Sequence, residues 1–480
     1  MSNKTIRSLA IISTILAIIS NIYVFTYPSL NPTKCSWKCF TENAEMVPPD
    51  NANVFQRFNF YVNRYLQDVL IHNFAEEGTQ PEADTSDSEV KDLHIMALGD
   101  PQINGIWSNT PYISRLDIYG NDHYLGHIIS TMRQRLTPSH IVVLGDLFSS
   151  QWIPDHEFYN RTRRYVSRLF NRDTSIIEDS LERNHVSGTK MFVVDWKEWA
   201  GKFLSIMQGD RSRFEFGYED VYKWVDNDDY LLVNVSGNHD IGYSGDATYQ
   251  HMTRFHEVFG KDNYWIEYDV GTDHSWRLVV LNNLLLEGPA LQPEFVEYDW
   301  EFLRQLQQRN FTGSTVLVTH VPFYKVEGLC YDPPSVVYYP EGYEKEPYKA
   351  HLLRSQNHIS QNVTNNVLEM IFNNGKPGII LAGHDHEGCE VYFNKLENGS
   401  WIASKEPRDD ATFTLHEVTV RSMMGDFHGN TGLLNGHFNQ RTRNWEWTFT
   451  LCPFSIQHFW WFSKVTAILS GFFCSLWMFS

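Results

Sequence analysis

Basic residues are scarce in this sequence, which has 39 Lys and Arg against 58 Asp and Glu and a net charge of -19 at pH 7. Nucleic-acid backbones are held by clusters of Lys and Arg, so this deficit argues against a nucleic-acid partner. It does not exclude a phosphate substrate, because a pair of bound divalent cations would be the dominant local charge at such a site. The sequence also has no internal repeats.

Apolar residues are not lacking. The 480 residues are 42% hydrophobic and 15% aromatic, which supports a sizeable folded core and excludes global disorder. The length suffices for one large domain or two ordinary ones.

Charge is missing from residues 8–27, and no A-x-A cleavage site follows them. The run is long enough to span a bilayer, and it is longer than the core of a signal peptide, so we expect an uncleaved anchor over residues 1–28. At the other end, residues 454–480 are also apolar, but Lys464 interrupts them. The aromatic residues 459–462 suit a membrane interface with Lys464 snorkelling, so a second span is expected, a terminal core helix being the alternative.

The charges flanking the first span do not decide its orientation, because basic residues lie on both sides of it. Other features favour an oxidising lumen for the body of the chain. N-x-S/T sequons lie between the two apolar ends, and cysteines are spaced so that disulfides are plausible but their pairing is open. The sequons are at Asn160, Asn234, Asn310, Asn362 and Asn398, and the cysteines are Cys35, Cys39, Cys330, Cys389 and Cys452.

Three further segments are distinguished by composition. Residues 29–91 form a stem, with a helix expected over 52–74 and an acidic linker over 76–89. Residues 92–453 form the main domain. Within it, residues 151–230 are too long for an ordinary crossover of about 30 residues, so we expect a helical insertion whose aromatic residues either pack or grip substrate.

Short apolar runs recur from residue 92, and each ends in a polar cluster. This pattern predicts buried strands of an α/β sandwich, with the polar clusters at the carboxyl ends where ligands bind. The clusters are Gly99-Asp100-Pro101-Gln102, Gly145-Asp146, Gly237-Asn238-His239-Asp240, Thr319-His320 and Gly383-His384-Asp385-His386.

Carboxylate, amide and imidazole groups in these clusters are the donors that a two-metal hydrolase requires. Such a site holds two cations about 3.5–4 Å apart, commonly with one shared carboxylate, and neutral imidazole suits Mn, Fe or Zn. Taken singly, each motif has a structural alternative: Gly-Asp after a strand is often a turn, and a strand-end His is often a core residue. Five such motifs in this order favour the metal site.

The ordered motifs resemble those of the calcineurin-like metallophosphoesterase superfamily, which implies a β-sandwich flanked by helices. By that resemblance Asp100 and His386 bind one metal, Asn238, His320 and His384 bind the other, and Asp146 bridges the two. His239 would be the catalytic histidine and Asp240 would orient it.

The first motif departs from the superfamily, whose usual Asp-x-His reads Asp100-Pro101-Gln102 in this chain. A Gln carbonyl oxygen can coordinate a hard cation but binds softer metals more weakly than imidazole does. Gln102 is therefore a candidate ligand of a looser site that would favour Mn over Zn.

The chain as a whole resembles the fungal enzymes that remove an ethanolamine-phosphate branch from a mannose of GPI anchors in the endoplasmic reticulum. The resemblance rests on the Asp-Pro-Gln motif, on His320-Val-Pro-Phe-Tyr followed by Cys330, and on residues 419–430, and it is stronger to the enzyme of the second mannose than to that of the first. It implies GPI-anchored proteins as substrate, a membrane location with the catalytic domain in the lumen, and possible contact with cargo-export receptors.

This reaction gives two parts of the chain specific tasks. The leaving group is a sugar oxygen that needs a proton, and His239 is the natural general acid. Residues 331–348, rich in Tyr and Glu, are expected to form a pocket for the ethanolamine ammonium, a surface loop being the alternative. Two other functions stay open: a phosphatase or nucleotide phosphodiesterase of the same fold, and a non-catalytic export adaptor.

Overall fold

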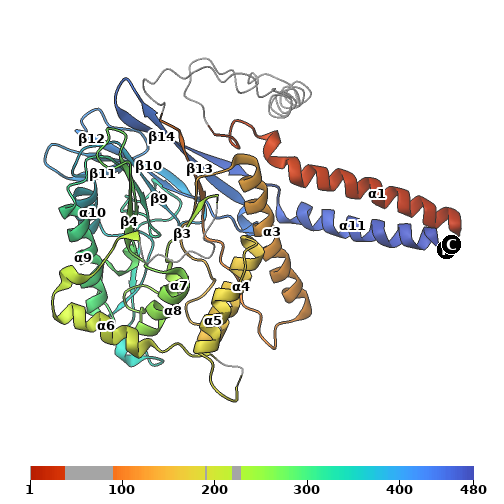
Figure 1. The fold of residues 1–480 in the computed structure, drawn as a ribbon, viewed down its shortest axis with the longest axis horizontal. Coiled ribbons are helices and arrows are strands. Elements are labelled where there is room, and N and C mark those ends of the chain that lie inside the picture. The colour runs from red at the N-terminus through yellow and green to blue at the C-terminus, as the bar shows by residue number, and fades with distance from the viewer. Residues whose placement is uncertain (1, 38–89, 190–191, 219–228, 480) are drawn as a thin grey trace, which may run out of the picture.

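The computed structural model describes residues 2–37, 90–189, 192–218 and 229–479. Two β-sheets lie face to face at its centre (Figure 1). The first sheet has the order β14-β13-β1-β2-β3, with β1 at Leu93–Leu98, β2 at His140–Val143, β3 at Leu231–Asn234, β13 at Asn430–Asn439 and β14 at Asn444–Pro453.

The second sheet has the order β11-β10-β12-β9-β6-β5-β4. Its strands are β4 at Tyr264–Tyr268, β5 at Trp276–Val280, β6 at Ser314–Val318, β9 at Gly378–Ala382, β10 at Cys389–Lys395, β11 at Trp401–Ser404 and β12 at Phe413–Thr419. A separate two-stranded sheet pairs β7 (Val336–Tyr338) with β8 (Leu353–Gln356).

The strands that carry the polar motifs run parallel. β1, β2 and β3 are parallel neighbours in the first sheet, and β5, β6, β9 and β12 are parallel neighbours in the second. Parallel strands present their carboxyl ends at one edge of a sheet. The motifs after β1, β2, β3, β6 and β9 therefore meet at one end of the sandwich.

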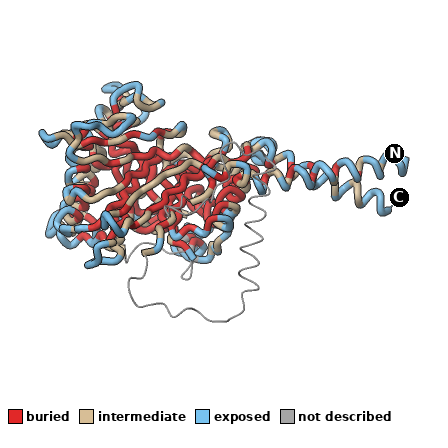
Figure 2. The backbone as a smooth tube through the Cα atoms, turned by 90° about the horizontal axis from the view of Figure 1, so that it is seen from above, coloured by how far each residue is buried: buried red, intermediate tan, exposed pale blue. Residues whose placement is uncertain are grey.

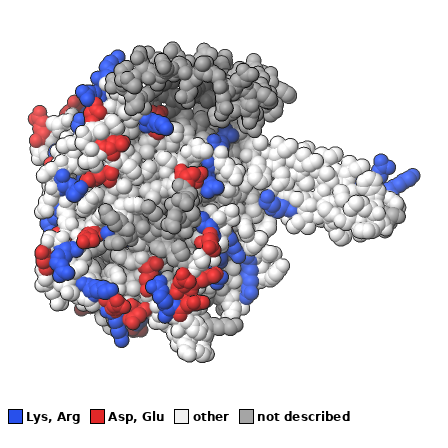
Figure 3. Space-filling model, in the orientation of Figure 1, with Lys and Arg blue, Asp and Glu red and all other residues white. Residues whose placement is uncertain are grey.

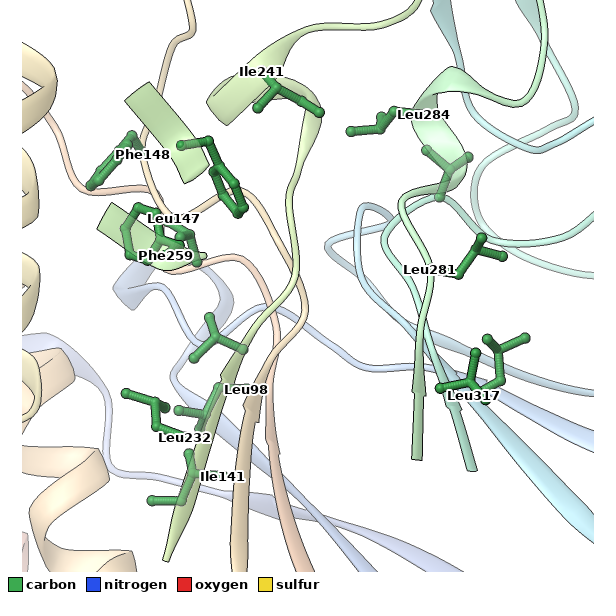
Figure 4. Close-up of a cluster of buried hydrophobic side chains, with 14 of the residues drawn as sticks. Leu98, Ile141, Leu147, Phe148, Leu232, Ile241, Phe259, Leu281, Leu284 and Leu317 are labelled. Atoms are coloured by element: carbon green, nitrogen blue, oxygen red, sulfur yellow. The ribbon is translucent and has the colours of Figure 1, made fainter. Parts of the chain in front are cut away.

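Both faces of these strands are buried, which is why their sequences are almost continuously apolar. Ile95 and Val142 point into the space between the sheets and meet Val316 and Leu381 of the second sheet. Alternate residues point outward to the helices. Figure 4 shows this outer layer, with Leu98, Ile141 and Leu232 on the first sheet and Leu281 and Leu317 on the second.

Helices cover both outer faces of the sandwich (Figure 1). α3 (Tyr112–Leu136) lies on the first sheet, and α9 (Pro293–Gln308) and α10 (Gln361–Ile371) lie on the second. α7 (Asn238–Ile241) and α8 (Tyr249–Phe259) follow β3, and short helical turns lie at Asn283–Leu285, Pro347–Lys349 and Gly425–Phe427. The predicted β-sandwich flanked by helices is confirmed.

The segment predicted as an insertion contains helices between β2 and β3. These are α4 (Asp155–Arg164) with a π-helical continuation over Tyr165–Leu169, α5 (Ser175–Arg183), α6 (Trp196–Gln208) and a turn over Arg211–Arg213. Their aromatic rings largely pack: Phe203 lies 5.4 Å from both Phe295 and Tyr298 of α9, measured between ring centroids.

The two terminal helices, α1 (Asn3–Thr26, followed by a turn over Tyr27–Leu30) and α11 (Gln457–Met478), project from the body as a pair, and both ends of the chain lie at its far tip (Figure 2). By length and composition both could cross a membrane. Small residues of α1 face α11, as in membrane helix pairs, and the Thr14 and Ser470 hydroxyls are 2.7 Å apart. Figure 3 shows almost no charged side chains between the tip and the root of the pair.

Two disulfides close the body. Cys35 is bonded to Cys452, which joins the segment that follows α1 to β14, and Cys330 is bonded to Cys389 at the start of β10. The predicted stem helix over 52–74, the acidic linker over 76–89 and Cys39 lie outside the described residues.

Candidate metal centre

Carboxylate and imidazole side chains from four of the strand ends converge in one place. Donor atoms of Asp146, His320 and His384 lie within 4.8 Å of one another, and so do those of Asp100, Asp146 and His386. Asp146 belongs to both groups, which is the position expected of a carboxylate shared between two cations.

The two amide side chains predicted as ligands lie in the same cluster. Asn238 Oδ1 is 3.0 Å from His320 Nε2, and Gln102 Nε2 is 3.1 Å from Asp146 Oδ2 and 3.2 Å from His386 Nε2. An amide flip would turn the Gln102 oxygen toward these atoms, since the two amide ends have the same shape. The structure thus brings all seven predicted ligands together.

The backbone at this cluster is strained. Asp100, Gln102, Asp146 and His384 have φ values of 40°, 42°, 48° and 74°. Non-glycine residues adopt such left-handed conformations rarely, and they gather at functional sites because the surrounding structure enforces them. Four of the seven predicted ligands are held in this way.

Two glycines allow the loops to approach this closely. A Cβ atom on Gly145 would lie 2.4 Å from His320 Nδ1, and one on Gly237 would lie 2.0 Å from the Asp146 amide nitrogen. Any side chain at either position would displace a predicted ligand.

Main-chain groups orient the ligands. His320 Nδ1 lies 2.7 Å from the Leu144 carbonyl oxygen, which leaves Nε2 pointing into the cluster. The His384 N–H donates to both carboxylate oxygens of Asp100, each at 3.1 Å. Such outer contacts set the ring orientation and basicity of metal-binding side chains.

Residues 419–430 form a motif to which the resemblance assigned no role, and they also hold the cluster in place. The Ser422 hydroxyl donates to the Asp100 carbonyl oxygen at 3.1 Å, and the Ser422 N–H donates to the His386 carbonyl oxygen at 3.1 Å. Ser422 therefore ties together the two loops that carry Asp100 and His386, a link that the motif alone did not reveal.

The charge of the cluster suits divalent cations. Burial raises the pKa of Asp100 to about 8, and burial together with Asp146 raises the pKa of Asp240 to about 7. Burial alone would lower the pKa of His320, yet Asp146 and Asp100 raise it to about 9. Asp100 and Asp240 thus face too little positive charge, and two divalent ions held by oxygen and imidazole donors would balance the buried carboxylates.

His239 lies beside the cluster and is partly open to solvent. Its Nε2 is 3.7 Å from Asp146 Oδ2, 37% of its side chain is exposed, and its backbone N–H donates to Asp146 Oδ1 at 2.8 Å. Its Nδ1 is buried and has no hydrogen-bond partner among the described residues. The exposed part of the ring can meet a bound substrate.

Asp240 has a different task from the predicted one of orienting His239. Its carboxylate accepts hydrogen bonds from the backbone N–H groups of Leu147, Phe148 and Gly237, at 3.2, 3.1 and 2.8 Å. Asp240 thus fixes the loop of Asp146 to the loop of Asn238 and His239. The sequence motif did not reveal this, because it could not show which backbone N–H groups of another loop would lie next to the Asp240 carboxylate.

A cavity of about 500 Å³ opens beside His239. Its wall combines Asn238 and His239 with polar, aromatic and charged side chains from loops and from β8, namely Ser149, Ser150, Gln151, Trp152, Tyr243, Asp246, Tyr339, Tyr343, Glu346, Arg354 and Ser355. Part of the segment predicted to form a pocket, residues 331–348, is therefore in this wall.

The acidic groups of the wall are partly neutralised. The Lys349 ammonium lies 3.1 Å from Asp246 and 2.8 Å from Glu346, and the Tyr339 hydroxyl donates to Asp246 at 2.8 Å. Asp246 is almost fully buried by these contacts, whereas the Glu346 side chain keeps 31% of its surface exposed. Glu346 is thus the carboxylate of this wall that a ligand can reach.

Several wall residues were not predicted as part of the site. Trp152, Tyr243 and Asp246 come from loops without periodic spacing, and Arg354 comes from the short strand β8, which the sequence did not indicate, so no pattern marked these residues. For Trp152 a signal existed, because the aromatic richness of residues 151–230 had raised the possibility of substrate contact.

The chain is 53% identical to Protein TED1 of Saccharomyces cerevisiae over 98% of both chains. It is 28% identical to Metallophosphoesterase 1 of Danio rerio, covering 35% of this chain and 45% of that one. Among solved structures it is similar to a 5'-nucleotidase precursor from Thermus thermophilus, with a TM-score of 0.28 and 11% identity over 79% of this chain and 58% of that chain. No protein-family model matches the chain.

Proposed function

The chain belongs to the metallophosphoesterase family, and on that premise we propose that it is a phosphodiesterase that removes an ethanolamine-phosphate branch from a mannose of GPI anchors. We place the reaction at the endoplasmic reticulum membrane, on the second mannose, in support of the export of GPI-anchored proteins. The observation that carries the proposal is the position of His239, between the ligand cluster and a cavity with aromatic and acidic walls.

Two divalent ions, which we propose to be Mn, would be held by Asp100, Gln102 and His386 on one side and by Asn238, His320 and His384 on the other, with Asp146 shared. Bound there, such ions supply activated water and stabilise charge on the phosphoryl oxygens. The amide oxygen of Gln102 is the reason to propose Mn, because an imidazole in its place would favour softer metals.

His239 would donate the proton that the leaving sugar oxygen requires. The imidazole lies at the cavity wall with 37% of its side chain exposed, and Nε2 lies 3.7 Å from the Asp146 carboxylate. The ring is thus within reach of a substrate held at the cluster. General acids of this kind are worth about 10²–10⁴-fold in rate.

The cavity offers complementary groups for the rest of the substrate. The Trp152 ring already holds the Lys349 ammonium 3.9 Å from its centroid, so this wall suits a cation. Tyr343 and the exposed part of Glu346 extend the same chemistry toward an alkylammonium group. The Arg354 guanidinium lies over the Tyr339 ring, 5.6 Å from its centroid, and can donate to phosphate or sugar oxygens.

The membrane helices and the disulfides support a lumenal enzyme acting on a lipid-anchored substrate. Confinement of both to one membrane raises their effective concentration. Disulfides such as Cys35–Cys452 persist in an oxidising lumen. Four of the five sequon asparagines are exposed; the fifth, Asn234, ends β3 and its side chain accepts a hydrogen bond from the Tyr165 hydroxyl at 2.6 Å.

The proposal is tested with the purified full-length chain, loaded with Mn, and GPI glycolipids that carry ethanolamine phosphate on a defined mannose. We expect mass spectrometry to show loss of one ethanolamine phosphate from the second mannose, and none with the Asp146→Asn variant. Hydrolysis of nucleotides without any release of ethanolamine phosphate would overturn the proposal and favour a nucleotide phosphodiesterase.

A further inference from the structure

Helix α3 crosses the root of the α1/α11 pair, at the edge of the body from which the pair projects (Figure 1). Its middle is packed against both helices. A Cβ on Gly120 would lie 1.9 Å from the Trp461 ring, and the His127 and Phe25 rings are 4.6 Å apart. α3 is therefore fixed to the membrane helices at the point where they leave the body.

The face of α3 that makes these contacts continues toward its N-terminus, where the described part of the chain leaves it uncovered. Ile113, Leu116, Gly120 and His127 recur at spacings of three, four and seven residues, which places them on one side of a helix. Gly120 and His127 are buried by the membrane helices, whereas Ile113 and Leu116 are 80% and 42% exposed.

Three more large aromatic side chains are exposed on this end of α3 and on the loop before it, although the Tyr119 ring also carries the Arg168 guanidinium 5.3 Å from its centroid. Tyr112 is 74% exposed, Tyr119 46% and Trp107 40%. Together Trp107, Tyr112, Ile113, Leu116 and Tyr119 form what we call the α3 apolar patch. Single exposed apolar residues are common on protein surfaces, but a contiguous group marks an interaction site.

The patch is preformed. The Arg115 guanidinium donates to the carbonyl oxygens of Trp107, Ser108 and Thr110, at 3.1, 2.9 and 2.8 Å. These bonds hold the loop that carries Trp107 against the first turn of α3. Binding through the patch would therefore not require this segment to become ordered first.

The root of the helix pair marks the level of the membrane surface. Trp460 and Trp461 lie in the first turns of α11, and the Lys464 ammonium folds back over the Trp460 and Phe25 rings, 5.4 Å from each centroid. Tryptophans and snorkelling lysines of this kind sit at the headgroup layer. α3 contacts Trp461 and Phe25 directly, so it lies at the same level.

We propose that the α3 apolar patch is an interfacial membrane contact, buried in the boundary between headgroups and acyl chains. The occupant is the same bilayer that α1 and α11 cross, because the patch continues the face that these helices cover, at the depth of their interfacial residues. Apolar and aromatic residues on one face of a helix lying in the membrane plane are the pattern of such contacts. The body would thus contact the membrane surface along α3, in addition to its attachment through α1 and α11.

The test places a nitroxide on the patch of the full-length chain in phosphatidylcholine–phosphatidylserine nanodiscs. Ile113→Cys is labelled after Cys39→Ser and Cys474→Ser, and the accessibility of the label to oxygen, which partitions into lipid, is compared with that to a water-soluble nickel complex. We expect oxygen to dominate at position 113, and again at position 116 with Leu116→Cys as a second, independent site.

Two control positions define the water-exposed result. Ser114→Cys is on the same turn but on the flank of the helix away from Ile113, and Val270→Cys lies in the turn after β4, where Val270 is 66% exposed. Both should favour nickel. Equal nickel access at 113 and 270 would overturn the proposal. Shielding of 113 and 116 from both reagents would also overturn it, in favour of a protein partner.

Discussion

The two halves of the ligand cluster are built differently. In the histidine half, Asn238 and His320 are buried and His384 is half-buried, and main-chain carbonyl oxygens hold both imidazoles, that of Leu144 at 2.7 Å from His320 and that of Gln356 at 3.1 Å from His384. In the glutamine half, Gln102 and His386 are both half-buried and contact each other.

This difference indicates which half of the cluster fixes the geometry around its metal ion and which half can accommodate different ions. A ligand whose ring orientation is set by the backbone can accept few geometries, so the histidine half should bind its ion tightly. In the glutamine half, an amide stands in place of an imidazole, and another predicted ligand holds it. Its orientation is therefore less constrained, and its bond to a metal ion is weaker. We expect two ions of unequal affinity, joined through Asp146.

Asp146→Asn should abolish metal binding in both halves of the cluster, because both use this carboxylate. We expect both ions to be lost and turnover of the phosphodiester to fall by about 10³-fold or more. Elemental analysis and hydrolysis assays measure the two effects. Asp410→Asn, at an exposed aspartate that pairs with Arg408, is the matched control and should change neither. Retention of one ion by Asp146→Asn would show that the halves are independent.

His239→Ala should separate chemistry from metal binding. We expect turnover on the sugar phosphodiester to fall by about 10²–10⁴-fold with both ions retained. A 4-nitrophenyl phosphodiester, whose leaving group needs no proton, should be hydrolysed nearly as fast by the variant as by the parent chain. Loss of an ion from the variant would instead make His239 a ligand of the histidine half.

Gln102→His should make the two halves more alike. An imidazole at this position would hold zinc more firmly, and we expect the affinity of the weaker ion for zinc to rise by about 10-fold. Stepwise removal by a chelator, followed by elemental analysis, should show one readily lost ion in the parent chain and two retained ions in the variant. Unchanged stepwise release would place Gln102 outside the coordination sphere.

Metal removal should leave a cluster whose stability depends on pH. Without ions, burial raises the pKa of Asp100 to about 8, and Asp146 with Asp100 raises the pKa of His320 to about 9 against burial. The folded state then binds more protons than the unfolded state, so stability falls as pH rises through both values. We expect the unfolding midpoint of the metal-free chain to be about 5 °C lower near pH 9 than near pH 7.

Calorimetry of the metal-loaded chain provides the comparison for this effect. Bound ions keep Asp100 ionised and His320 neutral across this range, so the midpoint should change less. An equal decrease with and without metal would assign the pH dependence to another part of the molecule.

The fold and the residues that gather at the cluster could be predicted from the sequence because both depend on local signals. A buried parallel strand reads as an apolar run, and its carboxyl end can be located from the polar residues that follow, as at Asp100 and His384. Loop-borne residues such as Asp246 could not be predicted, since only the folded chain brings them to the cavity. Asp240 shows a second limit: its neighbour in sequence suggested a partner, whereas its carboxylate bonds the backbone of another loop.

The α3 apolar patch could not be predicted from the sequence pattern either. The helix carries apolar residues on more than one side, because one side meets the body, and another meets α1 and α11 and continues, exposed, toward the N-terminus of α3. No single periodicity describes such a helix, so only its position beside Trp461 shows what the exposed residues face.

The bond between Cys35 and Cys452 has a consequence for how the molecule can be released from a membrane that α1 and α11 cross. The body carries an anchor at each end, and the disulfide fastens the two ends to each other where they enter it. A single proteolytic cut in the body leaves each fragment attached to its own helix and both fragments joined. In a membrane that both helices cross, an intact body would be released only by one cut beside each helix, and a body cut once would stay attached and in one piece.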